Sequence, residues 1–149
     1  MTATAETPAA RPNVPVQFWI VSVVSLLWNG FGAFDYSMSH LQGEAYYRAA
    51  GMSEAQIALM ASYPSWMHAV WAIGVWGSFL GSILLLLRSR WAVHAFGVSL
   101  LGAAGNLAYT ALTPPMAKAM GVTMPLVIVA IILLLIGYSR AMAKRGVLR

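Results

Sequence analysis

The sequence predicts an all-α integral membrane protein with four transmembrane helices, and three observations support this fold class. Of the 149 residues, 60% are hydrophobic and only 9% are charged, whereas soluble proteins contain about 25% charged residues. The basic residues also gather on one side of the expected topology. Finally, four stretches contain no Asp, Glu, Lys or Arg, and each is close to the ~20 residues that a helix needs to cross a bilayer: Val16–Phe34, Trp66–Leu87, Trp91–Thr113 and Gly121–Ser139.

This composition excludes several classes of protein. A soluble enzyme or a nucleic-acid-binding domain needs a charged, solvated surface, and the net charge of +5 is explained by Lys and Arg residues that flank membrane spans. The chain contains no Cys, so it is not a secreted disulfide scaffold. We therefore expect the lipid bilayer as a partner and no nucleic acid.

The elements follow one another in a simple order. Residues 1–15 are small, polar and rich in Pro, without an apolar period, and we expect a disordered cytoplasmic tail there. A transmembrane domain over 16–139 follows, with a basic cytoplasmic tail over 140–149. Its spans are expected at about 16–38, 66–87, 91–113 and 121–139.

The positive-inside rule orients the four spans. The loop between spans two and three shares one side with both tails, and that side holds most of the basic residues: Arg11, Arg88, Arg90, Arg140, Lys144, Arg145 and Arg149. The opposite side has only Arg48 and Lys118. Both termini are therefore expected in the cytoplasm.

The outer loop, Ser39–Ser65, is expected to contain a short interfacial helix. Ser53-Glu54-Ala55-Gln56 is a capping-box pattern, which predicts a helix that starts at Ser53. Gly51 interrupts an earlier weak helical stretch at Glu44–Ala50, and Pro64 limits the second one. Such helices lie along the membrane surface either as a packing cap or as a gating lid.

Two spans each have a polar face. The first-span face is Ser22, Ser25, Asn29, Gly32 and Tyr36, and the third-span face is Ser99, Gly102, Asn106, Tyr109 and Thr113. Residues at steps of three and four share one side of a helix. Polar side chains are costly in hydrocarbon unless they meet a partner or a cavity, so we expect these two faces to meet. They either form hydrogen bonds across a packed interface or line a ligand cavity.

The second span has a stripe of small residues. Gly77-x-x-x-Gly81 and Ser78-x-x-x-Ser82 are small-xxx-small pairs, which permit close backbone approach between membrane helices. We interpret them as a packing device, either inside the bundle or between protomers.

The three His residues do not have the spacing of a metal site. His68 and His94 open spans at opposite membrane faces, whereas His40 and His68 share the outer side and can meet. We expect His68 to be an interfacial residue that forms a hydrogen bond with Asp35, the only acid that adjoins a span. Motifs for phosphate binding, nucleophilic catalysis or metalloprotease chemistry are absent from the sequence. We therefore expect neither a metal nor a cofactor, and no enzyme activity.

Three segments of the sequence form a distinctive pattern: WNGFGAFDYSMSH (Trp28–His40), PSWMHAVWAIGVWGSFLGSILLLLRSRWAV (Pro64–Val93) and FGVSLLG (Phe96–Gly102). They resemble a family of small bacterial four-helix inner-membrane proteins whose members are commonly labelled sugar transporters. The residues that match the family pattern are Trp28, Asn29, Gly32, Asp35, Tyr36, Pro64, Trp66, Trp71, Trp76, Gly81, Arg88 and Arg90. The resemblance implies a multi-pass protein of the bacterial inner membrane and favours transport.

Two functions remain open from the sequence. The first is a small-solute transporter, with a sugar as one candidate solute, which would act as a homo-oligomer because four helices hardly enclose a transport path alone. The alternative is a non-transporting accessory module that binds a partner protein. For a transporter, the expected substrate-binding residues are Asn29, Asp35, Tyr36, Trp66, His68, Trp71, Asn106 and Tyr109.

Overall fold

The computed structural model describes residues 13–149, which form helices and connecting turns without any strand. The helices are α1 (Val16–Gln42), α2 (Glu44–Ala49), α3 (Glu54–Ala61), α4 (Ser65–Leu86), α5 (Trp91–Leu112), α6 (Pro114–Met120) and α7 (Thr123–Lys144). The tail expected over residues 1–15, with Arg11, lies outside the described residues except for its last three positions.

Four of these helices, α1, α4, α5 and α7, are long and apolar enough to cross a membrane, in agreement with the predicted spans. Pro15 and Pro64 precede α1 and α4 in extended conformation, where the missing proline N–H costs the helix nothing. Two helices run further than expected: α1 continues to Gln42 and α7 to Lys144. Large apolar side chains such as Leu101 (74% exposed) and Leu134 (73% exposed) cover the outside of the bundle, as expected for surfaces that face hydrocarbon.

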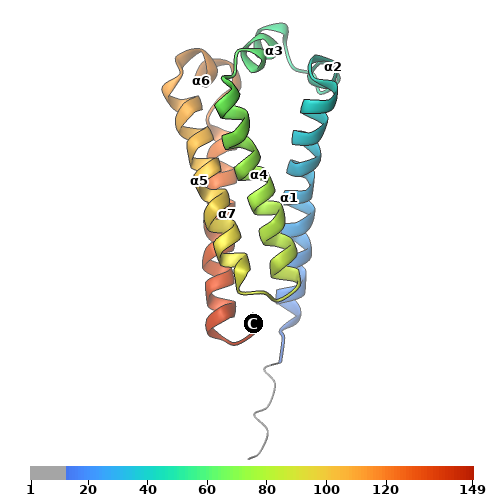
Figure 1. Ribbon diagram of the computed structural model, residues 1–149, viewed down its shortest axis with the longest axis vertical. Helices are drawn as coiled ribbons and strands as arrows, with labels where there is room; N and C mark the ends of the chain where they lie inside the picture. Colours follow the sequence, from blue (N-terminus) through green and yellow to red (C-terminus); the bar gives the residue numbers. More distant parts are fainter. Residues whose placement is uncertain (1–12) are drawn as a thin grey trace, which may run out of the picture.

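The long helices lie in the order α1, α4, α5, α7, each packed against the next (Figure 1). One end of the bundle, here called the terminal end, holds the start of α1, the turn between α4 and α5, and the C-terminus. The other, the capped end, holds α2, α3 and α6. At the terminal end the Phe18 ring of α1 stacks on Tyr138 of α7, with ring centroids 6.5 Å apart. The first and last long helices therefore approach each other at that end.

The capping box at the start of α3 is confirmed. Ser53 Oγ accepts a hydrogen bond from the Gln56 backbone N–H at 3.3 Å, and Gln56 Oε1 accepts one from the Ser53 N–H at 2.9 Å. Gly51, in the left-handed region at φ 82°, ends the α2 segment as expected. Because Arg48 of α2 forms ion pairs with Glu44 at 3.1 Å and Glu54 at 2.9 Å, α2 and α3 are tied together.

Helix α6 was not predicted. Pro114 and Pro115 occupy the first turn of α6, where proline is well tolerated. Gln56 Nε2 donates to the Ala119 carbonyl at 2.9 Å and thereby fastens α3 to α6. The cap over this end of the bundle is thus built from three short helices.

The small-residue stripe of α4 packs inside the bundle, against α5. A Cβ atom added at Gly77 would lie 3.0 Å from the Cα of Ser99, and one added at Gly102 would meet backbone atoms of Gly74 and Val70. Ser99 Oγ also donates to the Gly74 carbonyl at 2.5 Å. The predicted packing device therefore joins two neighbouring spans of one chain.

The last residues of the chain are packed rather than free, which differs from the expected basic tail. After α7, Gly146 adopts φ 72° and turns Val147 and Leu148 into the core, where they are 3% and 0% exposed. The backbone of Arg149 donates to the Arg88 carbonyl at 2.7 Å and accepts from the Arg90 N–H at 2.9 Å. We call residues 147–149 the C-terminal clasp, because they bind the turn between α4 and α5.

Candidate functional site

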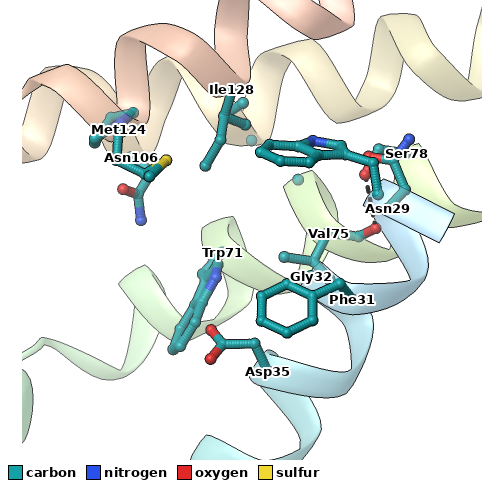
Figure 2. A pocket seen from close by; sticks show the side chains of 15 residues that line it. Asn29, Phe31, Gly32, Asp35, Trp71, Val75, Ser78, Asn106, Met124 and Ile128 are labelled. Atoms are coloured by element: carbon teal, nitrogen blue, oxygen red, sulfur yellow. Dashed lines mark hydrogen bonds between the residues drawn. The ribbon is translucent and has the colours of Figure 1, made fainter. Parts of the chain in front are cut away.

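A cavity of about 430 Å³ lies among the four long helices (Figure 2). This volume is in the range of known small-molecule sites. All four long helices contribute to its lining: Trp28, Asn29, Phe31, Gly32, Asp35, Trp71, Gly74, Val75, Ser78, Gly102, Ala103, Asn106, Met124, Pro125 and Ile128. We call it the inner chamber.

A hydrogen-bonded cluster of polar side chains joins α1 to α4 beside the inner chamber. Ser25 and Ser82 share a hydrogen bond between their hydroxyls at 2.7 Å, and Asn29 Nδ2 donates to Ser82 Oγ at 2.8 Å. Ser82 Oγ in turn lies 3.0 Å from the Ser78 carbonyl. All of these side chains are buried, so each polar group has the partner that an apolar surrounding requires.

The polar faces of the first and third spans do not form hydrogen bonds across a packed interface, and of the two expected arrangements the structure has the shared cavity. The face of α1 contacts α4 through Ser25 and Asn29, whereas the face of α5 contacts the other side of α4 through Ser99. The physical reason is that α4 has small residues on both sides, so two neighbours can approach it closely. The faces do share the inner chamber, because Asn29 and Asn106 both line it.

Asp35 lines the capped side of the inner chamber. Its Oδ1 accepts a hydrogen bond from the Tyr46 hydroxyl of α2 at 2.8 Å. This hydrogen bond, with smaller effects of burial and of the Asp35 charge, raises the pKa of the Tyr46 phenol above 10.0. The phenol is therefore protonated at neutral pH and donates its O–H hydrogen bond to the carboxylate.

The expected pair of Asp35 with His68 does not form. The buried Nδ1 of His68 has no hydrogen-bond partner within residues 13–149, and the ring packs instead against His40 at a centroid distance of 5.2 Å and Tyr63 at 6.0 Å. The two His rings on this side therefore meet, as expected. Tyr46 occupies the position next to Asp35 that the sequence had assigned to His68.

A second cavity of about 280 Å³, the outer chamber, continues from the first towards the cap. Six residues line both chambers, so the two are contiguous: Asp35, Trp71, Asn106, Met124, Pro125 and Ile128. Cap residues including Tyr46, Met60 and Tyr63 line the outer chamber. Burial raises the pKa of the Tyr63 phenol, an effect that hydrogen bonding with Thr110 and Asn106 partly offsets.

The eight residues expected to bind a substrate fall into two groups. Four line the chambers: Asn29, Asp35, Trp71 and Asn106. The other four lie in aromatic contacts outside the inner chamber: Tyr36, Trp66, His68 and Tyr109. Tyr36 meets the Trp71 ring edge to face at 5.0 Å, and Trp66 meets Tyr109 at 5.7 Å. Tyr36 thus supports a lining residue without lining the inner chamber itself.

Sequence reasoning missed the contribution of the last span and of the cap. Met124, Pro125 and Ile128 of α7 form one wall, but apolar residues in an apolar helix give no signal of a site. Tyr46 and Tyr63 belong to the outer loop, where an aromatic residue is not distinctive. Ser78 was detectable, since it lies one turn from Ser82 on the small-residue face.

The chamber lining offers groups that can contact a ligand. No group of three or more His, Cys, Asp or Glu side chains gathers anywhere in the described part of the chain. The chambers offer instead one carboxylate, two amides and indole rings, which recognise a ligand by charge, hydrogen bonds and stacking. No protein-family model, curated protein or solved structure matches this chain.

Proposed function

We propose that the protein is a small-solute transporter and that the solute binds in the inner chamber. One observation supports this function above the others: two contiguous chambers run from among the four spans to the cap. Towards the terminal end the path is filled by a core that includes Phe18, Leu85, Phe96 and Leu148, each 0% exposed. The site is thus closed by the packed core at the terminal end and covered only by the short helices of the cap at the other end. This is the geometry expected of a state that takes up solute from the capped side.

The cap is well placed to act as the gate in this proposal. Among the described elements, the main neighbours of α2 are α1 and α3, and those of α3 are α2 and α6. The ion pairs of Arg48 keep α2 and α3 together, so they can move as one unit. The Tyr46–Asp35 hydrogen bond then acts as a latch between the cap and the chamber.

Orientation follows from charge in the same proposal. Six basic residues lie at the terminal end and no acidic residue does within the described chain, whereas the capped end has Asp35, Glu44 and Glu54 beside Arg48 and Lys118. By the positive-inside rule the terminal end is cytoplasmic in a bacterial inner membrane, and the cap faces outwards. The transporting unit is a homo-oligomer, because α1 and α7 flank the inner chamber without packing along their length.

A plugged chamber tests this function directly. Gly32 lines the inner chamber, and a Cβ added there meets no atom within 4 Å, so Gly32→Leu fills the site without disturbing helix packing. Gly137 of α7 is equally open but does not line either chamber, which makes Gly137→Leu the matched control.

The measurement is uptake of a panel of labelled solutes by proteoliposomes that contain the purified protein. We expect at least one solute to be accumulated by the parent and the Gly137→Leu variant, and not by the Gly32→Leu variant. If the parent accumulates none, or if Gly32→Leu transports like the control, the transport function is wrong. Stable co-purification of one partner protein would then favour the accessory module.

A further inference from the structure

We infer that the solute is an organic cation with an apolar, aromatic body, a conclusion that rests on the proposed function and names its substrate class. Among the described residues that line the two chambers, Asp35 is the only one with a formal charge at neutral pH. The inner chamber therefore presents one negative charge and no basic side chain. A solute of opposite charge complements it.

Within residues 13–149, no basic side chain forms an ion pair with the carboxylate of Asp35. Glu44 and Glu54, the other described acids, are both paired with Arg48, whereas Asp35 accepts one hydrogen bond from the neutral Tyr46 hydroxyl. A charge beside apolar surface is costly unless an opposite charge approaches it. A cationic group next to Asp35 removes that cost, so charge favours a cation over a neutral or anionic solute.

Aromatic rings stand beside the carboxylate. Figure 2 shows Asp35, Phe31 and Trp71 on one side of the inner chamber, with Asn106, Met124 and Ile128 across from them. The Trp71 indole is held by the edge-to-face contact with Tyr36. A cation near an indole face gains about 0.5–2 kcal/mol from the ring quadrupole, so Trp71 and Asp35 attract the same group.

The remaining polar groups are too few for a polyhydroxylated solute such as a sugar. Asn29 Nδ2 already donates to Ser82, and the Ser78 hydroxyl donates to the Val75 carbonyl. Asp35 already accepts from Tyr46, and Asn106 forms a hydrogen bond with Tyr63. Few polar atoms of the inner chamber are therefore left for a solute, chiefly the remaining lone pairs of Asp35 and the amide oxygen of Asn29, since the other lining is largely hydrocarbon or aromatic. Each buried sugar hydroxyl without a partner costs about 1–3 kcal/mol, whereas an apolar body meets this lining without such a cost.

Two probes of the same shape and opposite charge test the inference: tetraphenylphosphonium, a cation, and tetraphenylborate, an anion. Binding to the purified full chain in detergent is measured by equilibrium dialysis against empty micelles, which corrects for partition into detergent. We expect the parent to bind the cation at least about 100-fold more tightly than the anion, about 2.8 kcal/mol at 1.4 kcal/mol per tenfold.

Substitutions then assign the charge preference to Asp35. We expect Asp35→Asn to weaken cation binding at least about 10-fold, with Asp35→Glu retaining it. Glu44→Gln changes the net charge equally, at the exposed Arg48 pair outside the chambers, and should leave binding unchanged. If Asp35→Asn does not fold, as judged by circular dichroism, the comparison of the two probes on the parent and the Asp35→Glu variant decides.

The outcomes separate this inference from the transport function. Equal binding of both probes, or cation binding that survives Asp35→Asn, overturns the inference. If neither probe binds while the parent still accumulates an uncharged sugar that Gly32→Leu blocks, the transport function stands and the cation specificity is wrong. If no solute is accumulated at all, the transport function itself is wrong.

Discussion

The closest approach between α4 and α5 lies at Gly102, and replacement of this residue by Ala measures how much the small-residue stripe contributes to stability. The added Cβ would overlap the Gly74 backbone N and would lie 2.7 Å from the Val70 carbonyl oxygen. Ordinary contact begins at 3.4 Å, so the backbones must separate by more than the roughly 0.7 Å that the Val70 oxygen alone requires. Both neighbours are backbone atoms, which cannot rotate away as a side chain can.

The cost follows from three terms. Overpacking of a close interface costs about 1–3 kcal/mol, and stretching the Ser99–Gly74 hydrogen bond costs about 0.6 kcal/mol more. The higher helix propensity of Ala compared with Gly stabilises the folded state by about 1 kcal/mol. We therefore expect Gly102→Ala to lower the free energy of unfolding by roughly 0.6–2.6 kcal/mol.

Gly97 provides the matched control on the same helix. A Cβ added at Gly97 meets no atom within 4 Å, so Gly97→Ala keeps only the propensity gain of about 1 kcal/mol. The assay is reversible unfolding in mixed micelles, titrated with sodium dodecyl sulfate and followed by far-ultraviolet circular dichroism. If Gly102→Ala proves as stable as Gly97→Ala, the close approach of α4 and α5 is wrong.

Three further predictions concern the polar cluster, the clasp and the orientation. Ser82→Ala removes the hydroxyl that Asn29 donates to and should cost about 0.6–1.5 kcal/mol of unfolding free energy; an unchanged midpoint in the same micelle titration would contradict the cluster. Leu148→Ala should lower the free energy of unfolding by about 2–5 kcal/mol, since the side chain is fully buried. A change near zero would mean that the C-terminal clasp does not pack in solution. Cysteines placed singly at Ser53 and Ser89, in a chain without native Cys, should react with an impermeant thiol reagent from outside and from inside respectively; the reverse pattern would invert the topology.

Signals that depend on neighbours in the sequence predicted the local structure well. The start of α3 at Ser53 needs only the Ser53–Gln56 exchange, and the start of α1 needs only Pro15. The packing role of Gly77 was predictable for the same reason, since small residues at steps of four form a flat strip on any helix.

Partners across the bundle were harder to predict, because a polar face does not specify which helix it meets. Asn29 was assigned to α5 and instead donates to Ser82 of α4. Asp35 was assigned to His68 and instead accepts from Tyr46, since the position of α2 depends on how the cap folds back. Half of the expected binding residues line the chambers, and Tyr36 with the other aromatic residues packs beside them.

The linear order of the long helices has a consequence for biosynthesis. As the nascent chain leaves the ribosome, α4 is the first long partner made after α1, α5 follows α4, and α7 follows α5. Each long helix therefore packs against the long helix that was synthesised just before it. The polar side chains of α1, Ser25 and Asn29, gain their hydrogen-bond partner Ser82 as soon as α4 has been made. The inner chamber comes into existence last, when α7 supplies its final wall and Tyr138 reaches Phe18. A chain that ends before α7 therefore lacks one wall of the inner chamber.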